Sequence, residues 1–173
     1  MKKSFLLSLF IFSLSTSCNK EEVKSESVLL IKGITSVDEL GYTISIDEND
    51  WRLNDKFTEK EKQLFDTLNF SKTAIAEPMP ISENTSYKTP VILFFPNPFR
   101  SQGGLFYYHD KHILNLIVVD SKYTKLYSFR VRASHYFALN LNKLDKGIYR
   151  IYYVIQDSQY NIVHLGHGDI ENE

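Results

Sequence analysis

Short runs of β-branched and aromatic residues, each bounded by turn residues, dominate the second half of the chain. Apolar runs of this length between Gly, Pro, Asn and Asp are typical of β-strands. Seven of them are found at residues 91–95, 105–108, 113–120, 125–131, 136–141, 148–155 and 162–165. So many strands within about 75 residues indicate an all-β fold, in which residues 91–173 form an antiparallel β-sandwich.

The alternation of apolar and polar positions separates half-exposed strands from covered ones. In residues 148–155 the apolar odd-numbered positions oppose Arg150 and Tyr152, so we expect this strand to show one face to water. Residues 113–119 are apolar on both faces, as in a central strand that is covered on both sides. We expect the apolar stretch at residues 51–70 to cover the second face of that strand.

Residues 28–90 form an extension in front of the predicted sandwich. Within it, β-branched runs at 28–31 and 42–46 predict two further short strands. Residues 71–90 carry three prolines among Ser, Thr and Asn, which predicts a connector without regular structure.

One short helix is predicted in this extension, at residues 57–69. Thr58 and Glu61 have the spacing of a capping box, in which the two side chains satisfy the first free amides of a helix. The apolar residues that follow fall on one helical face. Trp51 lies just upstream and is expected in the core, where it joins the helix to the main body.

Composition and charge narrow the possible partners. The 173 residues include 20 Lys and Arg against 21 Asp and Glu, a formal net charge of -1. A duplex-binding surface needs an excess of basic residues to displace counterions from phosphates, so we expect no nucleic-acid partner. The 12 Phe and 11 Tyr suit packed strands and agree with a β-rich class.

Residues 1–17 have the order of an export signal: two lysines, an apolar run at 5–14 and three small residues, immediately before Cys18. The ten-residue run is too short to span a bilayer, which takes about 20 apolar residues as a helix. The segment resembles a bacterial lipobox. The resemblance implies that residues 1–17 are a removed signal peptide and that Cys18 carries acyl chains, which anchor a protein to a membrane without spanning it.

Residues 18–27 are polar and are expected to act as a tether. Within them, Lys20, Glu21 and Glu22 resemble the short basic-then-acidic export signal of Bacteroidetes surface lipoproteins. The resemblance implies attachment to the outer membrane with display on the cell surface. The periplasm-facing leaflet is the alternative location.

Residues 91–99 (VILFFPNPF) and 139–149 (LNLNKLDKGIY) resemble the Ig-like C-terminal modules of Bacteroidetes proteins that use type IX secretion. The resemblance implies an Ig-like sandwich over residues 91–173 and an origin in that phylum. Because proline fixes φ and lacks an N–H group, Pro96 and Pro98 predict a rigid turn after the first strand of the sandwich.

Two histidine pairs, His109 with His112 and His164 with His167, are the candidate metal ligands. Neither pair has the spacing of a helical metal motif, and the acidic residues 47–50 lack the ligand order of an EF-hand loop. We therefore expect no metal, no cofactor and no catalytic residue.

Three tyrosines, Tyr107, Tyr108 and Tyr152, are candidate binding residues, because exposed rings stack on sugars or anchor protein partners. The leading hypothesis is a non-catalytic, membrane-anchored envelope lipoprotein that binds or scaffolds another protein. The alternative is a glycan-binding surface module, and a metal-dependent enzyme is third. A row of exposed rings would favour glycan binding, whereas a mixed aliphatic and aromatic patch would favour a protein partner.

Overall fold

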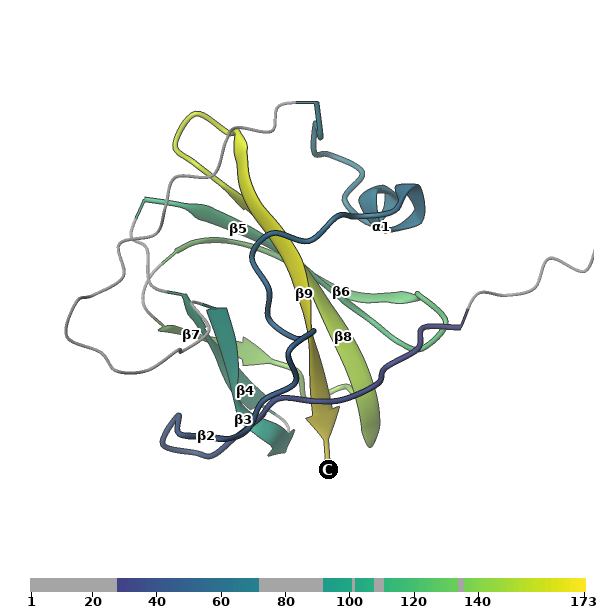
Figure 1. Cartoon of the computed structure of the whole chain (residues 1–173), viewed down its shortest axis with the longest axis vertical. Helices are drawn as coiled ribbons and strands as arrows, with labels where there is room; N and C mark the ends of the chain where they lie inside the picture. The colour runs from purple at the N-terminus through teal and green to yellow at the C-terminus, as the bar shows by residue number, and fades with distance from the viewer. Residues whose placement is uncertain (1–27, 72–91, 101, 108–110, 134–135) are drawn as a thin grey trace, which may run out of the picture.

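Two β-sheets face each other across an apolar core in the computed structural model of the chain (Figure 1). The structure describes residues 28–71, 92–100, 102–107, 111–133 and 136–173. Its elements in chain order are β1 (Ser36–Val37), β2 (Thr43–Ser45), α1 (Glu59–Gln63), β3 (Ile92–Arg100), β4 (Gln102–Tyr107), β5 (Ile113–Val119), β6 (Lys125–Arg132), β7 (Tyr136–Asn140), β8 (Gly147–Gln156) and β9 (Ile162–Asn172). Among the described residues, no helix has the length and apolar character needed to cross a membrane.

The pairing of the strands identifies the sandwich as Ig-like. One sheet contains β3, β4 and β7, and the other has the order β9-β8-β5-β6. Pairing is antiparallel within both sheets. In chain order β3, β4 and β7 are the first, second and fifth of the seven strands in the sandwich, and they face the sheet formed by the other four. Ig-like domains divide their strands between two sheets in this way. The prediction of an all-β, Ig-like sandwich with one short helix in the N-terminal extension is confirmed.

Strand β3 belongs to both sheets. Its first half pairs with β4, and near its end Phe99 pairs in parallel with Asn172 of β9. The change of partner occurs at Pro96 and Pro98, which lack the N–H groups that a continuous ladder needs. The prediction of a turn at these prolines is wrong, because the strand continues through them to Arg100.

The buried side chain of Asn97 stabilises this crossing point. Its Nδ2 donates to the carbonyl oxygens of Thr35 and Asp169, at 2.8 and 2.9 Å, and its Oδ1 accepts from the N–H of Glu171 at 2.9 Å. One amide side chain therefore connects the N-terminal extension, β3 and β9, and replaces bonds that the flanking prolines cannot make.

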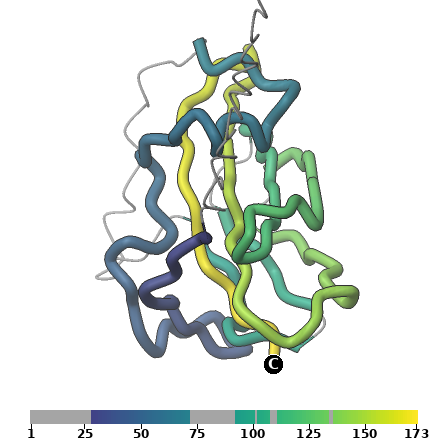
Figure 2. The backbone as a smooth tube through the Cα atoms, turned by 90° about the vertical axis from the view of Figure 1, so that its right-hand side faces the viewer, coloured from purple at the N-terminus to yellow at the C-terminus, as the bar shows by residue number. Residues whose placement is uncertain are grey.

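A second apolar cluster lies on the other face of the β9-β8-β5-β6 sheet, under the N-terminal extension. Figure 2 shows residues 28–71, in purple to teal, lying over the yellow and green strands. The extension contributes Leu29, Phe57, Leu64 and Phe65, and the sheet contributes Ile117, Val119, Tyr152 and Val154. The prediction that the stretch 51–70 covers the second face of the central strand is confirmed.

The same cover contradicts the expectation that the strand 148–155 shows one face to water. The residues from Ile151 to Gln156 are all buried, because the rings of Phe57 and Tyr123 pack against Tyr152 from the extension side. Strand β8 is therefore a central strand, like β5.

The helix begins as predicted and ends early. The capping box of Thr58 and Glu61 is present, but α1 ends at Gln63 and gives way to tighter turns, in which the N–H of Phe65 donates to the carbonyl of Lys62. The reason is packing, since these turns bring the rings of Phe65 and Phe70 together with Phe57 on the sheet. The strand predicted at residues 28–31 is absent from the described structure.

Candidate functional site

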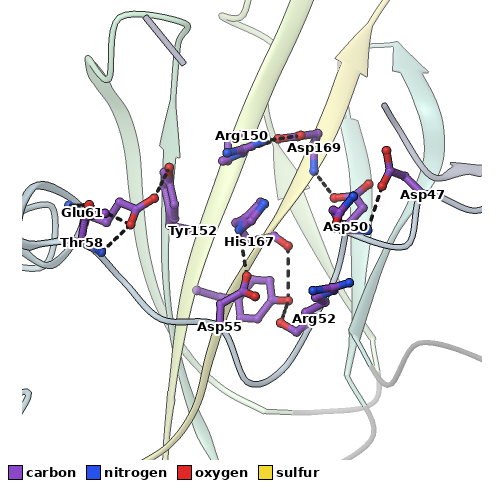
Figure 3. Close-up of polar contacts among 12 residues, drawn as sticks. Asp47, Asp50, Arg52, Asp55, Thr58, Glu61, Arg150, Tyr152, His167 and Asp169 are labelled. Carbon is purple, nitrogen blue, oxygen red and sulfur yellow. Dashed lines mark hydrogen bonds and ion pairs between the residues drawn. The ribbon is translucent and has the colours of Figure 1, made fainter. Parts of the chain in front are cut away.

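A group of buried and half-buried polar side chains lies where the extension runs beside β9. Residues 50–55 follow this strand, with the N–H of Trp51 donating to the carbonyl of His167 at 2.9 Å and the N–H of Asp55 donating to that of Leu165 at 3.0 Å. We call residues 50–55 together with β9 the seam. Figure 3 shows its polar contacts.

Two glycines allow the close approach of the two chains in the seam. A Cβ at Gly166 would collide with the main-chain carbonyl of Arg52, and a Cβ at Gly168 would collide with the ring of Trp51. The Trp51 ring is buried and stacks on Tyr153 with 6.1 Å between centroids, so its prediction as a core residue is confirmed.

Beside the seam, an ion pair with two hydrogen bonds joins Arg150 of β8 to Asp169 of β9. Arg150 Nε donates to Asp169 Oδ1 at 2.6 Å, and Arg150 Nη2 donates to Asp169 Oδ2 at 2.7 Å. The side chains are only 11% and 5% exposed, so water screens them little. Burial alone would lower the pKa of Arg150, but the hydrogen bonds and charge of Asp169 raise it above its ordinary value.

Asp50 is a second buried carboxylate beside this pair. Its Oδ2 accepts from the N–H of Thr35 at 2.9 Å, and its Oδ1 accepts from the N–H of Asp169 at 2.7 Å. Desolvation by burial raises the pKa of Asp50 to about 6, although both hydrogen bonds act in the opposite direction. Asp50 thus fastens the start of the extension to β9 through main-chain groups.

His167 and Asp55 form the third contact of the seam, with 2.9 Å between Nδ1 and Oδ2. The two atoms are within ion-pair distance, but Asp55 Oδ2 makes no hydrogen bond among the described residues, so the contact is a close charge pair rather than a hydrogen bond that orients the ring. The His167 ring also lies 5.9 Å from the ring of Tyr152, whose hydroxyl donates to Glu61 Oε1 at 3.0 Å. Glu61 therefore serves both the helix cap and the buried tyrosine.

A pocket of about 230 Å³ opens beside these groups and is lined by Leu30, Lys32, Gly33, Asp47, Asn49, Asp50, Arg150, His167 and Asp169. Its buried charges already bond one another or the main chain across the seam. Within the residues that the structure describes, no three His, Cys, Asp or Glu side chains are grouped so that they would hold a metal ion.

The histidines predicted as two pairs are placed differently in the fold. His112 and His164, one from each pair, lie with 6.5 Å between ring centroids. His112 Nδ1 is 2.8 Å from the hydroxyl of Tyr107, and His164 Nδ1 is 3.3 Å from Asn54 Oδ1. His109 lies outside the described residues.

The candidate binding tyrosines do not form an exposed row. Tyr107 and Tyr152 are fully buried, so the expectation that their rings face solvent is wrong. Tyr107 packs in the core between the sheets, and Tyr152 is covered by the N-terminal extension. Tyr108 and the lipid-attachment residue Cys18 lie outside the described residues.

A surface patch that the sequence reasoning missed lies on and beside β2. Leu40, Tyr42, Ile44 and Ile46 are between 61% and 80% exposed, and we call these four residues the hairpin patch. Strand β2 is the outermost strand of the sheet order. The alternating pattern Leu-Gly-Tyr-Thr-Ile-Ser-Ile was a signal for a strand, but nothing local in it indicates that its apolar face is uncovered.

No family model matches the chain, and no similar curated protein is found. Among solved structures, it resembles a DUF3244 family protein with an immunoglobulin-like β-sandwich fold from Bacteroides vulgatus ATCC 8482, with 16% identity and a TM-score of 0.37. The match covers 48% of this chain and 84% of the other. The fold described above rests on the strand pairing within this chain.

Proposed function

We propose that this chain is a non-catalytic, membrane-anchored envelope lipoprotein that binds or scaffolds another protein through the hairpin patch, which its N-terminal extension places beside the Ig-like sandwich. The observation that carries the proposal is the exposure of Ile44 on an edge strand and of Leu40, Tyr42 and Ile46 beside it. Contiguous exposed apolar surface marks an interaction site in soluble domains. An edge strand also offers main-chain groups to which an extended partner segment adds.

The composition of the hairpin patch favours a protein over a glycan. It holds three aliphatic side chains and one tyrosine, whereas sugar binding relies on exposed rings. The tyrosines considered for binding either a glycan or a protein were Tyr107, Tyr108 and Tyr152, and the rings of Tyr107 and Tyr152 are buried. A patch of mixed aliphatic and aromatic side chains is the composition expected of a surface that binds a protein rather than a glycan.

The proposed anchor is the lipid on Cys18. The sequence places this residue ten positions before Val28, where the described structure begins, so a short polar tether would join the N-terminal extension to the membrane. We propose attachment to the outer membrane with display on the cell surface, and the periplasm-facing leaflet is the alternative. Acyl chains alone supply such an anchor.

The contacts of the seam support a structural role for its charged residues. Arg150 and Asp169 satisfy each other, and Asp50 accepts hydrogen bonds from two main-chain N–H groups. Each contact joins segments distant in sequence. Among the described residues, the pair of Asp55 and His167 favours the third hypothesis, an enzyme, because it places a carboxylate next to an imidazole that lines a pocket.

A cross-linking experiment in intact cells tests the binding proposal. The variant Ile44→Asp places a charge in the hairpin patch, and Ile148→Asp makes the same change at a 41% exposed isoleucine outside it. We expect wild type and Ile148→Asp to give the same protein adduct, and Ile44→Asp to lose it. Equal adducts from both variants would overturn the assignment of the hairpin patch.

A further inference from the structure

Two strands at opposite ends of one sheet order have an unpaired edge within the described structure. The order runs β2-β1-β3-β9-β8-β5-β6, so β2 and β6 are its ends. Strand β2 pairs only with β1, and β6 pairs only with β5, among the described strands. An edge strand presents free main-chain donors and acceptors and is a template for pairing with another chain.

The two edges carry opposite charge, although the chain as a whole is nearly neutral. Residues 32–52 around β2 hold five acidic residues, Asp38, Glu39, Asp47, Glu48 and Asp50, against two basic ones, Lys32 and Arg52. Residues 120–145 around β6 hold five basic residues, Lys122, Lys125, Arg130, Arg132 and Lys143, against two acidic ones, Asp120 and Asp145. All five basic residues of the β6 segment are exposed, whereas in the β2 segment Glu39 and Glu48 are exposed and Asp50 is buried.

Strand β6 is long enough for another strand to pair with its free edge, and it has partly exposed apolar side chains that such a strand would cover. It is eight residues long, and its inward side chains Tyr127, Phe129 and Val131 are only half-buried although they pack against the core. Leu126 is exposed on the other face. A strand added at this edge would extend the cover over these side chains, and the hairpin patch would supply apolar residues for it.

Like charges disfavour the symmetric alternative, in which β2 pairs with β2 of a second copy. An antiparallel pair of this kind brings the acidic residues 38–39 of one copy towards the acidic residues 47–48 of the other. Like charges directly opposite each other destabilise strand pairs. The acidic flanks of β2 instead fit a basic partner edge, which this chain carries at β6.

We propose that the chain associates with itself head to tail, with the β2 edge of one copy adding to the β6 edge of the next. This inference rests on the proposed function and names a second copy of this chain as the partner. The contact is heterologous, because it joins two different surfaces, so each copy keeps one free edge and further copies add. A lipid-anchored chain of this kind would form linear arrays on a membrane.

Sedimentation of the full chain carrying Cys18→Ala, with the two edges changed separately, tests this proposal. Ile44→Asp disables the β2 edge, and Arg130→Glu with Arg132→Glu reverses the charge of the β6 edge. We expect the parent to associate as its concentration rises and each variant to sediment as a monomer. An equimolar mixture of the two variants has one intact edge of each kind, so it should form a heterodimer and nothing larger.

Salt dependence and a folding control complete the test. Because the contact joins opposite charges at the surface, we expect the dissociation constant of the parent to rise at least about tenfold between low salt and 0.5 M salt. Ile148→Asp should associate as the parent does, and circular dichroism should show that all variants are folded.

The outcomes separate this proposal from the proposed function. A parent chain that stays monomeric at every concentration overturns self-association, while loss of the cellular adduct by Ile44→Asp would still support binding to a different protein. A symmetric β2–β2 dimer would give a different result: Ile44→Asp would abolish association, the β6 change would leave it intact, and the mixture would contain dimers of the β6 variant only. That result would overturn the head-to-tail arrangement.

Discussion

The guanidinium of Arg150 and the carboxylate of Asp169 meet through two parallel hydrogen bonds, at 2.6 and 2.7 Å, beneath the N-terminal extension. The residues occupy paired positions on β8 and β9, so the strand register itself places them together. The N–H of Asp169 also donates to Asp50. One position of β9 therefore ties two strands of the sandwich to the extension.

Asp169→Asn should destabilise the protein by about 3 kcal/mol, because it leaves the buried charge of Arg150 without a counter-ion. The matched control is Glu59→Gln, which removes the exposed Glu59–Lys62 pair and should cost about 0.5 kcal/mol or less. Urea unfolding of the three proteins measures both changes. Equal, small losses in both variants would contradict the structural role of the seam.

The raised pKa of Asp50 predicts that its contribution to stability falls as pH rises. The folded carboxyl titrates at about 6 and the unfolded one at 3.8, so the contribution is fully present below pH 3.8 and is lost as pH rises through 6. The difference corresponds to about 3 kcal/mol. Asp50→Asn removes this group, so wild-type stability minus variant stability should decline between pH 4 and pH 7. A flat or rising difference would contradict the burial described for Asp50.

Phe57→Ala tests the cover over β5 and β8. The ring is buried among Phe65, Phe70 and Tyr152, and its loss should cost about 3 to 4 kcal/mol. Leu40→Ala is the control, since this exposed side chain buries little area and should change stability by less than about 0.5 kcal/mol.

A chain that begins at Lys88 extends the same test, because it lacks the whole extension. It should melt at a lower temperature or aggregate, since the buried face formed by Ile117, Val119 and Tyr152 becomes exposed. A soluble, monomeric truncation with unchanged melting temperature would show that the sandwich folds without its cover.

The strands of the sandwich were predictable because each depends on a local pattern of apolar and turn residues. The last strand shows the limit of that reasoning. The prediction ended it at Leu165, whereas β9 continues to Asn172. Gly166 and Gly168 indicate a loop in isolation, and only the approach of Arg52 and Trp51, more than a hundred residues earlier in the chain, explains glycines within a strand.

The candidate site was less predictable for the same physical reason. Alternation assigned Tyr152 to an outward face, which is correct for the sandwich alone, but the ring of Phe57 covers that face. The opposite difference occurs in the hairpin patch. An apolar residue such as Ile44 is expected to be buried, but its side chain is exposed because no described strand pairs with the outer edge of β2.

Cys18→Ala should move the protein from the membrane to the soluble fraction of a native-host lysate. The reason is that acyl chains on this residue are the proposed membrane attachment, and burial of each CH₂ contributes about 0.8 kcal/mol. Fractionation after a high-salt wash measures the shift. Retention of the variant in washed membranes would contradict the lipoprotein assignment.

Photo-cross-linking from position 44 in living cells measures whether the hairpin patch contacts a protein. A photoreactive amino acid replaces Ile44 on β2, and the matched control replaces the exposed Ile148 on β8. We expect a covalent protein adduct from position 44 and none from position 148. If the chain associates head to tail, the linked peptide should come from β6 of a second copy. The absence of any protein adduct from position 44 would show that the hairpin patch does not bind a protein.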